Sequence, residues 1–297
     1  MFRGAFTALV TPFKNGQVDY PSFKALIEDQ ITKGIDGIVP CGTTGESATL
    51  TEKEHGEVIE FAVKTAAKRV PVIAGTGSNS TAEAIQYSKH ALEVGADALL
   101  LVCPYYNKPS QRGVLAHFKA IADAVNLPQI LYNIPGRCGI NMAPETIAEL
   151  AKHPRIVAVK EASGNLEQMS RVRQLCPPDF DLLSGDDTLT LPILSIGGTG
   201  VISVLSNLLP RETSRTVHAY LEGKTGESRD LFFKYADLTK TVMGVDGNPT
   251  GIKAALSLRG MMAEEFRLPV VPVTPESKDL IRKQMDKLGL LSGAAAR

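Results

Sequence analysis

Residues 98–102, Ala98-Leu99-Leu100-Leu101-Val102, are apolar at every position. A strand with one face in water alternates apolar and polar residues, whereas a parallel strand covered by helices is apolar throughout. Cys103-Pro104 closes this run, and the segment that follows has the spacing of apolar residues that is typical of a helix. The stretch therefore predicts one β-strand of a parallel sheet, followed by a crossover helix.

The same pattern occurs eight times along the chain. The predicted strands are Ala5–Val10, Gly37–Pro40, Val72–Ala74, Ala98–Val102, Gln129–Tyr132, Ile156–Lys160, Asp181–Ser184 and Gly200–Val204. Eight such strand–helix units fit either a closed barrel or an open, doubly wound sheet. An open nucleotide-binding sheet should carry GxGxxG after its first strand, but Thr11-Pro12-Phe13 stands there. We therefore expect an α/β fold of the (β/α)8 TIM-barrel type.

The residues after the eighth strand have mostly helical patterning and are more numerous than one closing helix requires. We expect the catalytic barrel to occupy residues 1–225, and a C-terminal helical extension, residues 226–297, to pack on it. The short Ala-rich tail Gly293–Arg297 is expected to be frayed.

The composition excludes several classes of function. Lys and Arg number 32 and Asp and Glu number 32, so no basic surface for nucleic acid is expected. No stretch approaches the roughly 18 apolar residues of a membrane helix. Four scattered cysteines form no CxxC pair, which favours a reducing cytoplasm, and the five histidines fall in or beside helices, so no metal site is expected.

Lys160 is the first candidate for chemistry, because the active site of a barrel lies at the carboxyl ends of its strands. It closes the apolar run Ile156–Val159, where desolvation would lower the pKa of its amine and provide the neutral nucleophile that Schiff-base chemistry requires. The alternative is an ion pair with Glu161 or another carboxylate at the rim, and position alone favours neither.

Other strand ends supply further candidates, each with a plainer alternative. Tyr132 offers a phenol that can shuttle protons if Thr43 or Thr44 relays them, although Tyr132 taken singly favours a core aromatic whose hydroxyl bonds to the backbone. The loop Gly42–Gly45 could bind a carboxylate through its backbone N–H groups, or could simply form a tight turn. Arg137 could hold a second carboxylate with its planar guanidinium, or could be solvated.

Together these segments resemble the dihydrodipicolinate synthase family over nearly the whole chain, from Phe2 to about Leu290. The motifs that carry the resemblance are Gly42-Thr43-Thr44-Gly45-Glu46, Tyr105-Tyr106-Asn107-Lys108-Pro109, Tyr132-Asn133-Ile134-Pro135-Gly136-Arg137, Val159-Lys160-Glu161-Ala162-Ser163-Gly164 and Leu183-Ser184-Gly185-Asp186-Asp187.

The resemblance implies a Schiff-base lyase that condenses pyruvate with L-aspartate 4-semialdehyde in lysine and diaminopimelate biosynthesis. No cofactor is implied beyond the covalent pyruvate imine on Lys160. The implied proton relay is Tyr132, Thr43 and Tyr106, with Tyr106 crossing from a neighbouring subunit of a homotetramer built as a dimer of dimers. The implied substrate-binding residues are Thr44, Arg137, Gly185 and Ile202, of which Arg137 holds the carboxylate of the semialdehyde.

A feedback site for lysine is also implied by the resemblance. Its residues are Ser47, Ala48, His55, Asn79, Glu83 and Tyr105. Glu52 stands where sensitive enzymes often have histidine, so the strength of inhibition stays open. The family commonly reads Asn-Pro-Ile-Pro-Val-Lys where this chain has Asn248-Pro249-Thr250-Gly251-Ile252-Lys253, which leaves the start of the local helix in question.

Three other functions compete with this hypothesis. A sibling lyase would use the same imine on a keto-sugar acid, but such lyases generally lack an arginine in the context of Arg137. A pyridoxal-phosphate barrel needs a phosphate cradle, and the glycine-rich Gly197–Gly200 lies before the last strand, at the wrong end. A catalytically silent barrel could bind lysine without forming an imine.

Overall fold

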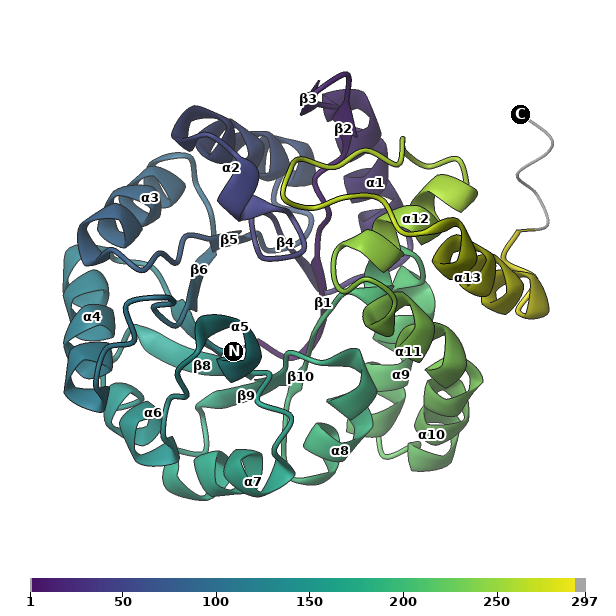
Figure 1. Cartoon of the computed structure of the whole chain (residues 1–297). Coiled ribbons are helices and arrows are strands. Elements are labelled where there is room, and N and C mark those ends of the chain that lie inside the picture. The colour runs from purple at the N-terminus through teal and green to yellow at the C-terminus, as the bar shows by residue number, and fades with distance from the viewer. Residues whose placement is uncertain (1, 292–297) are drawn as a thin grey trace.

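The computed structural model describes residues 2–291 as an eight-stranded parallel barrel surrounded by helices, with further helices at its C-terminal side (Figure 1). The predicted TIM-barrel fold is therefore confirmed. The barrel strands are β1 (Gly4–Ala8), β4 (Gly37–Val39), β5 (Ile73–Gly75), β6 (Ala98–Val102), β7 (Gln129–Asn133), β8 (Ile156–Glu161), β9 (Asp181–Ser184) and β10 (Gly200–Ser203).

Neighbouring strands pair in the order β4-β1-β10-β9-β8-β7-β6-β5, and a parallel bridge between Ile38 and Val72 joins the two ends of that order. The circle is thus closed and has no free edge. Alternate strand residues point inward and form a core of their own, which includes Phe6, Leu100, Tyr132 and Ile202. Their neighbours point outward and pack against the helices.

Helices follow the strands and shield their outer faces. Those around the barrel are α1 (Tyr20–Thr32), α2 (Glu52–Ala66), α3 (Thr81–Glu93), α4 (Gln111–Ala124), α5 (Pro135–Cys138), α6 (Pro144–Leu150), α7 (Leu166–Leu175), α8 (Thr190–Ser195) and α9 (Pro210–Leu221). Single turns of 3-10 helix are η1 (Ser47–Thr49), η2 (Asp187–Leu189) and η3 (Leu205–Asn207). Thr51 and Glu54 form a reciprocal capping box that fixes where α2 begins.

The strand boundaries agree with the predicted ones to within two residues, and two local features were not predicted. The first strand stops at Ala8, and a hairpin of β2 (Phe13–Lys14) and β3 (Gln17–Val18) follows it. Its turn is Asn15-Gly16, with φ of 54° and 76°, which is the two-residue turn that such hairpins favour. Arg137, expected in a loop, lies in the short helix α5.

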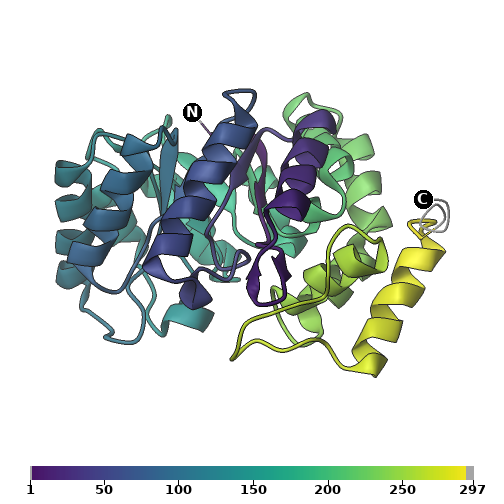
Figure 2. The ribbon, with the colours of Figure 1, turned by 90° about the horizontal axis from the view of Figure 1, so that it is seen from above.

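The expected C-terminal extension contains α10 (Thr225–Lys234), α11 (Ala236–Gly244), α12 (Thr250–Leu258) and α13 (Pro275–Lys287). In Figure 2 its last part lies beside the barrel, at the end where the β2–β3 hairpin projects. The boundary at residue 225 remains a prediction, and the tail Gly293–Arg297 lies outside the described residues.

The departure at residues 248–253 does not prevent a helix from forming, because α12 begins at Thr250. Thr250 Oγ1 donates to Gly247 O at 2.5 Å. A Cβ at position 251 would lie 2.2 Å from Val242 O of α11, so glycine permits the close packing of these two helices.

Candidate active site

Lys160 and Tyr132 are direct neighbours at the carboxyl ends of β8 and β7, where the register pairs them with each other. Both side chains are buried, each 5% exposed, and Lys160 Nζ lies 4.2 Å from the centre of the Tyr132 ring. Glu161 projects to the other side of β8 and accepts hydrogen bonds from Asn133 and Gln168. The alternative in which Glu161 forms an ion pair with Lys160 is therefore wrong.

The surroundings of Lys160 favour the neutral amine. Burial lowers its pKa to about 8, the charge of Asp187 opposes this shift, and Arg137 adds to it. Gly185 packs directly on the lysine stem, since a Cβ at that position would lie 3.1 Å from Lys160 Cε and 2.7 Å from Ala162 Cβ. A side chain there would displace the amine, which explains why glycine is required.

A side-chain hydrogen bond joins Tyr132 to Thr43 of the loop after β4. Burial raises the pKa of Tyr132 to about 12, and this hydrogen bond and the charge of Arg137 partly oppose the shift. Thr43 is half-buried and lines an open cavity, so a hydroxyl path leads from the barrel interior to that cavity. This is the arrangement that a proton relay requires.

The cavity has a volume of about 700 Å³ and is bounded by Thr43, Tyr105, Arg137 and Asn248, among others. Arg137 is exposed and donates from Nη2 to Asn248 O at 2.9 Å, which leaves other guanidinium donors for a ligand. Thr44 is buried and accepts a hydrogen bond from Asn248 Nδ2 at 3.0 Å. Asn248 thus links the two candidate carboxylate-binding residues.

Ile202 is fully buried and belongs to the inward-facing core, together with Tyr132. Tyr106 differs from the other candidates because it is 88% exposed and has a φ of 71°. Its phenol lies outside the buried set of Lys160, Tyr132 and Thr44.

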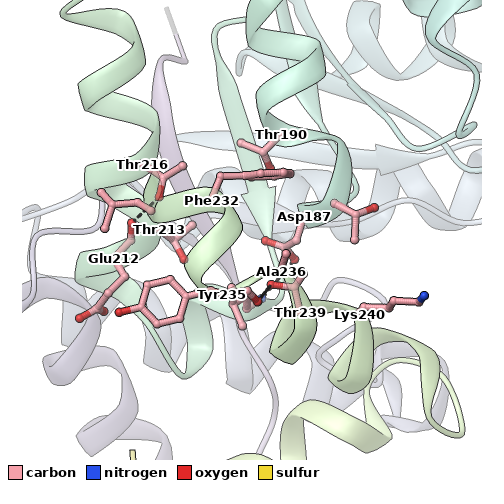
Figure 3. A pocket seen from close by; sticks show the side chains of 13 residues that line it. Asp187, Thr190, Glu212, Thr213, Thr216, Phe232, Tyr235, Ala236, Thr239 and Lys240 are labelled. Atoms are coloured by element: carbon pink, nitrogen blue, oxygen red, sulfur yellow. Dashed lines mark hydrogen bonds between the residues drawn. The ribbon is translucent and has the colours of Figure 1, made fainter. Parts of the chain in front are cut away.

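Asp187 is a buried carboxylate that the sequence did not single out for a role. Its oxygens accept hydrogen bonds from Ser203 Oγ at 2.5 Å and from Val204 N at 2.8 Å, which joins the ends of β9 and β10. Its outer side helps to line a separate cavity of about 430 Å³ between η2, α9, α10 and α11 (Figure 3). That cavity contains none of the candidate site residues predicted from the sequence.

Comparison with known proteins identifies the family. Residues 1–288 match the model of the dihydrodipicolinate synthetase family. A 4-hydroxy-tetrahydrodipicolinate synthase from Syntrophus aciditrophicus is 52% identical over 291 residues, which cover 98% of this chain and 100% of that protein. The chain belongs to the dihydrodipicolinate synthetase family.

Solved structures of dihydrodipicolinate synthases agree with this assignment. The enzyme from Aquifex aeolicus has a TM-score of 0.96 and 46% identity, covering 97% of this chain and 99% of that one. The enzyme from Cyanidioschyzon merolae, solved with lysine bound, has a TM-score of 0.95 and 47% identity, covering 98% and 99%.

In this member of the dihydrodipicolinate synthetase family, most of the candidate lysine-binding residues line the same cavity as Arg137. They are Ser47, Ala48, His55, Glu83 and Tyr105. His55 stacks on Tyr87 at 4.5 Å between ring centres, and its Nε2 donates to Gly75 O at 2.9 Å. Burial lowers the pKa of His55, so its ring is neutral at physiological pH. Asn79 is not among the lining residues, and its carbonyl accepts a hydrogen bond from Asn107 Nδ2.

Three further residues surround the site but received no role from the sequence: Glu46, Asp187 and Asn248. Glu46 and Asp187 stand inside motifs that resemble the family, in the segments that follow β4 and β9, but the sequence does not show that they are buried. Within residues 2–291, no group of three His, Cys, Asp or Glu side chains is placed to hold a metal ion. In the same range, no helix is both long and apolar enough to cross a bilayer.

Proposed function

We propose that this chain is a 4-hydroxy-tetrahydrodipicolinate synthase, which condenses pyruvate with L-aspartate 4-semialdehyde in the diaminopimelate route to lysine. The observation that carries the proposal is the buried amine of Lys160, with its lowered pKa, against the ring of Tyr132. The names of the relatives support the substrates.

The reaction begins when the neutral amine of Lys160 attacks the ketone carbon of pyruvate. Loss of water gives an imine, and removal of a methyl proton converts it to an enamine. The enamine carbon attacks the aldehyde carbon of the semialdehyde, and the aldehyde oxygen takes up a proton. The amino group of the semialdehyde then attacks the imine carbon, closes the ring and releases Lys160. No external cofactor takes part in this sequence.

Tyr132 and Thr43 are proposed to move the protons of these steps, because their hydroxyls are hydrogen-bonded and lead to the open cavity. Tyr106 is proposed to complete the relay from a neighbouring subunit. Its exposure suits such a role, since an 88% exposed tyrosine gains a partner only from another molecule. A tetramer formed from two such dimers is the proposed assembly.

Arg137 is proposed to hold the carboxylate of the semialdehyde, while Thr44, Gly185 and Ile202 contact the pyruvate unit. Of these, only Arg137 carries a charge that selects for an acidic aldehyde. Lysine is the proposed feedback inhibitor, and it would bind among Ser47, Ala48, His55, Asn79, Glu83 and Tyr105. All four cysteines are free and buried, which suits the proposed location in a reducing cytoplasm.

Reduction with borohydride in the presence of pyruvate tests the proposal. Peptide mass spectrometry should find the reduced adduct on Lys160, and Lys160→Met should abolish it. Aspartate semialdehyde should then be consumed in preference to sialic acid or ketodeoxygluconate. A label elsewhere, or equal turnover of a keto-sugar acid, would contradict the proposed function.

A further inference from the structure

A network of buried polar side chains lies on the outer side of β7 and β8, behind Tyr132 and Lys160. Its centre is Glu161, which is fully buried. Glu161 accepts hydrogen bonds from Asn133 Nδ2 at 3.0 and 3.2 Å, from Ser163 N at 2.7 Å and from Gln168 Nε2 at 3.1 Å. Burial raises the pKa of Glu161, and these N–H donors oppose that rise because they stabilise the carboxylate.

The network continues into the segment that follows Arg137. Asn133 Oδ1 accepts a hydrogen bond from Met142 N at 3.0 Å, and Asn133 Nδ2 donates to Asn141 Oδ1 at 2.8 Å. Asn141 in turn donates to Gln168 Oε1 at 2.6 Å. The chain leaving α5 is therefore fastened to the same carboxylate as the ends of β7 and β8.

We propose that Asn133 and Glu161 are positioning residues, which hold Tyr132, Lys160 and Arg137 in their reactive arrangement. Successive side chains on a strand project to opposite faces, so the orientation of residue 161 sets that of residue 160. The same holds for Asn133 and Tyr132, and the register pairs Asn133 with Glu161 just as it pairs Tyr132 with Lys160. A hydrogen-bonded pair outside the barrel thus fixes the angle between the two reacting side chains inside it.

The chemistry of the network explains why a carboxylate stands at its centre. Every group hydrogen-bonded to this carboxylate is a donor, either an N–H group or the hydroxyl of Ser163, and an amide in place of Glu161 would turn an NH2 group toward some of them. The resulting shift of β8 by a fraction of an ångström would move Lys160 Nζ relative to Tyr132. A displacement of about 1 Å can cost roughly 100-fold in rate. This inference rests on the proposed role of Lys160.

Glu161→Gln tests the proposal, with Asp181→Asn as the matched control. Asp181 is also a buried strand carboxylate, 2% exposed, but it begins β9 at the opposite end of the barrel and accepts a hydrogen bond from Phe2 N. Single-turnover trapping of pyruvate with borohydride is measured across pyruvate concentrations for the intact protein, together with the melting temperature. A positioning role lowers the limiting rate, whereas a loss of binding alone raises the half-saturating concentration.

Glu161→Gln should lower the limiting rate by about 10- to 100-fold, with the half-saturating concentration within about threefold of wild type. Asp181→Asn should lower the melting temperature comparably but keep the rate within about twofold. A wild-type rate in Glu161→Gln, or equal slowing in Asp181→Asn, would overturn the proposal. Failure of the unmutated protein to form an adduct on Lys160 would instead overturn the proposed function, and this inference with it.

A milder variant covers the case in which Glu161→Gln does not fold. Gln168→Met removes the half-buried donor to Glu161 Oε2, together with the hydrogen bonds between Gln168 and Asn141. Its limiting rate should fall by about threefold or more, because one N–H donor of the carboxylate is lost. An unchanged rate in a folded Gln168→Met protein, where Glu161→Gln cannot be obtained, would likewise overturn the proposal.

Discussion

Replacing Glu46 with glutamine should destabilise the protein, because it would leave a buried ammonium group without its counter-charge. Glu46 Oε1 lies 2.6 Å from Lys253 Nζ, and the two side chains are 1% and 0% exposed. This pair joins the end of the Gly42–Glu46 loop, next to Thr43, to helix α12 of the C-terminal extension. The perturbation is Glu46→Gln, which keeps the shape and removes the charge.

The contacts that remain around Lys253 set the size of the effect. Breaking a buried ion pair by removing one partner costs about 3–5 kcal/mol. Lys253 Nζ would still donate to Thr11 O at 3.0 Å and to Glu265 O at 2.7 Å. The rings of Phe13 and Phe266 would still lie 4.5 and 4.7 Å away. We therefore expect the lower end, about 3 kcal/mol, which corresponds to a melting temperature lower by about 6–12 °C.

The deficit should shrink as the pH rises. Burial lowers the pKa of Lys253 from its usual value, and Glu46 opposes that shift, so the pKa falls further in Glu46→Gln. A lysine with a lowered pKa in the folded state binds fewer protons there than in the unfolded chain, so stability rises with pH through that window. At a pH between the folded-state pKa of Lys253 in the variant and that in the wild type, Lys253 is neutral in the folded variant but still charged in the folded wild type. The variant is then no longer destabilised by an unpaired buried charge.

Thermal unfolding monitored by circular dichroism at several pH values measures this effect. Glu227→Gln is the matched control, because it also removes one carboxylate from an ion pair, but that pair is exposed, with Arg215 and Glu227 side chains 37% and 42% accessible. Its melting temperature should stay within about 2 °C of wild type. Equal melting temperatures for the two variants, or a Glu46→Gln deficit that grows with pH, would refute the reasoning.

Three further outcomes are expected. The rate of pyruvate trapping should rise with pH through a midpoint of about 8, because burial lowers the pKa of Lys160 to that value and only the neutral amine attacks; a midpoint near the ordinary lysine pKa would contradict this. Arg137→Ala should lower kcat/KM for aspartate semialdehyde by about 10- to 100-fold while pyruvate trapping falls far less, since a charged hydrogen bond is lost only from the second substrate; parallel losses would disprove that role. Glu83→Ala should abolish the rise in melting temperature that added lysine produces in the wild type, and an undiminished rise would remove Glu83 from the proposed feedback site.

The sequence predicted the strands well because their signal is local. Each barrel strand is a short apolar run closed by a turn residue, and such a run can be recognised without knowing what packs on it. The order of strand ends then brought Tyr132 and Lys160 to the same end of the barrel. Position alone could not decide between a nucleophile and a rim ion pair for Lys160, because Ile156–Val159 is apolar at every position and does not show which face is the interior.

The contacts that shape the cavity depend on residues far apart in the chain. Thr44 meets Asn248, which lies 204 positions later, and Glu46 meets Lys253, which lies 207 positions later. No periodicity reports such contacts, since they arise only after the barrel has closed and the extension has returned to its mouth. The helix that begins at Thr250 also could not be predicted from local sequence, because its packing depends on how closely α11 approaches Gly251.

The two halves of the proposed reaction use residues from two parts of the chain. Lys160, Tyr132 and Gly185, which are proposed to serve the imine with pyruvate, lie at the strand ends of the barrel, where hydrogen-bonded strands hold them. The wall of the cavity beyond Thr43 is different, because Asn248, Pro249, Pro269 and Val270 of the extension help to form it. Arg137 is tied to that wall through Asn248 O. The proposed selection of the second substrate by Arg137 would therefore depend on how the extension is held against the barrel, and the buried Glu46–Lys253 pair is a direct link between the extension and the barrel.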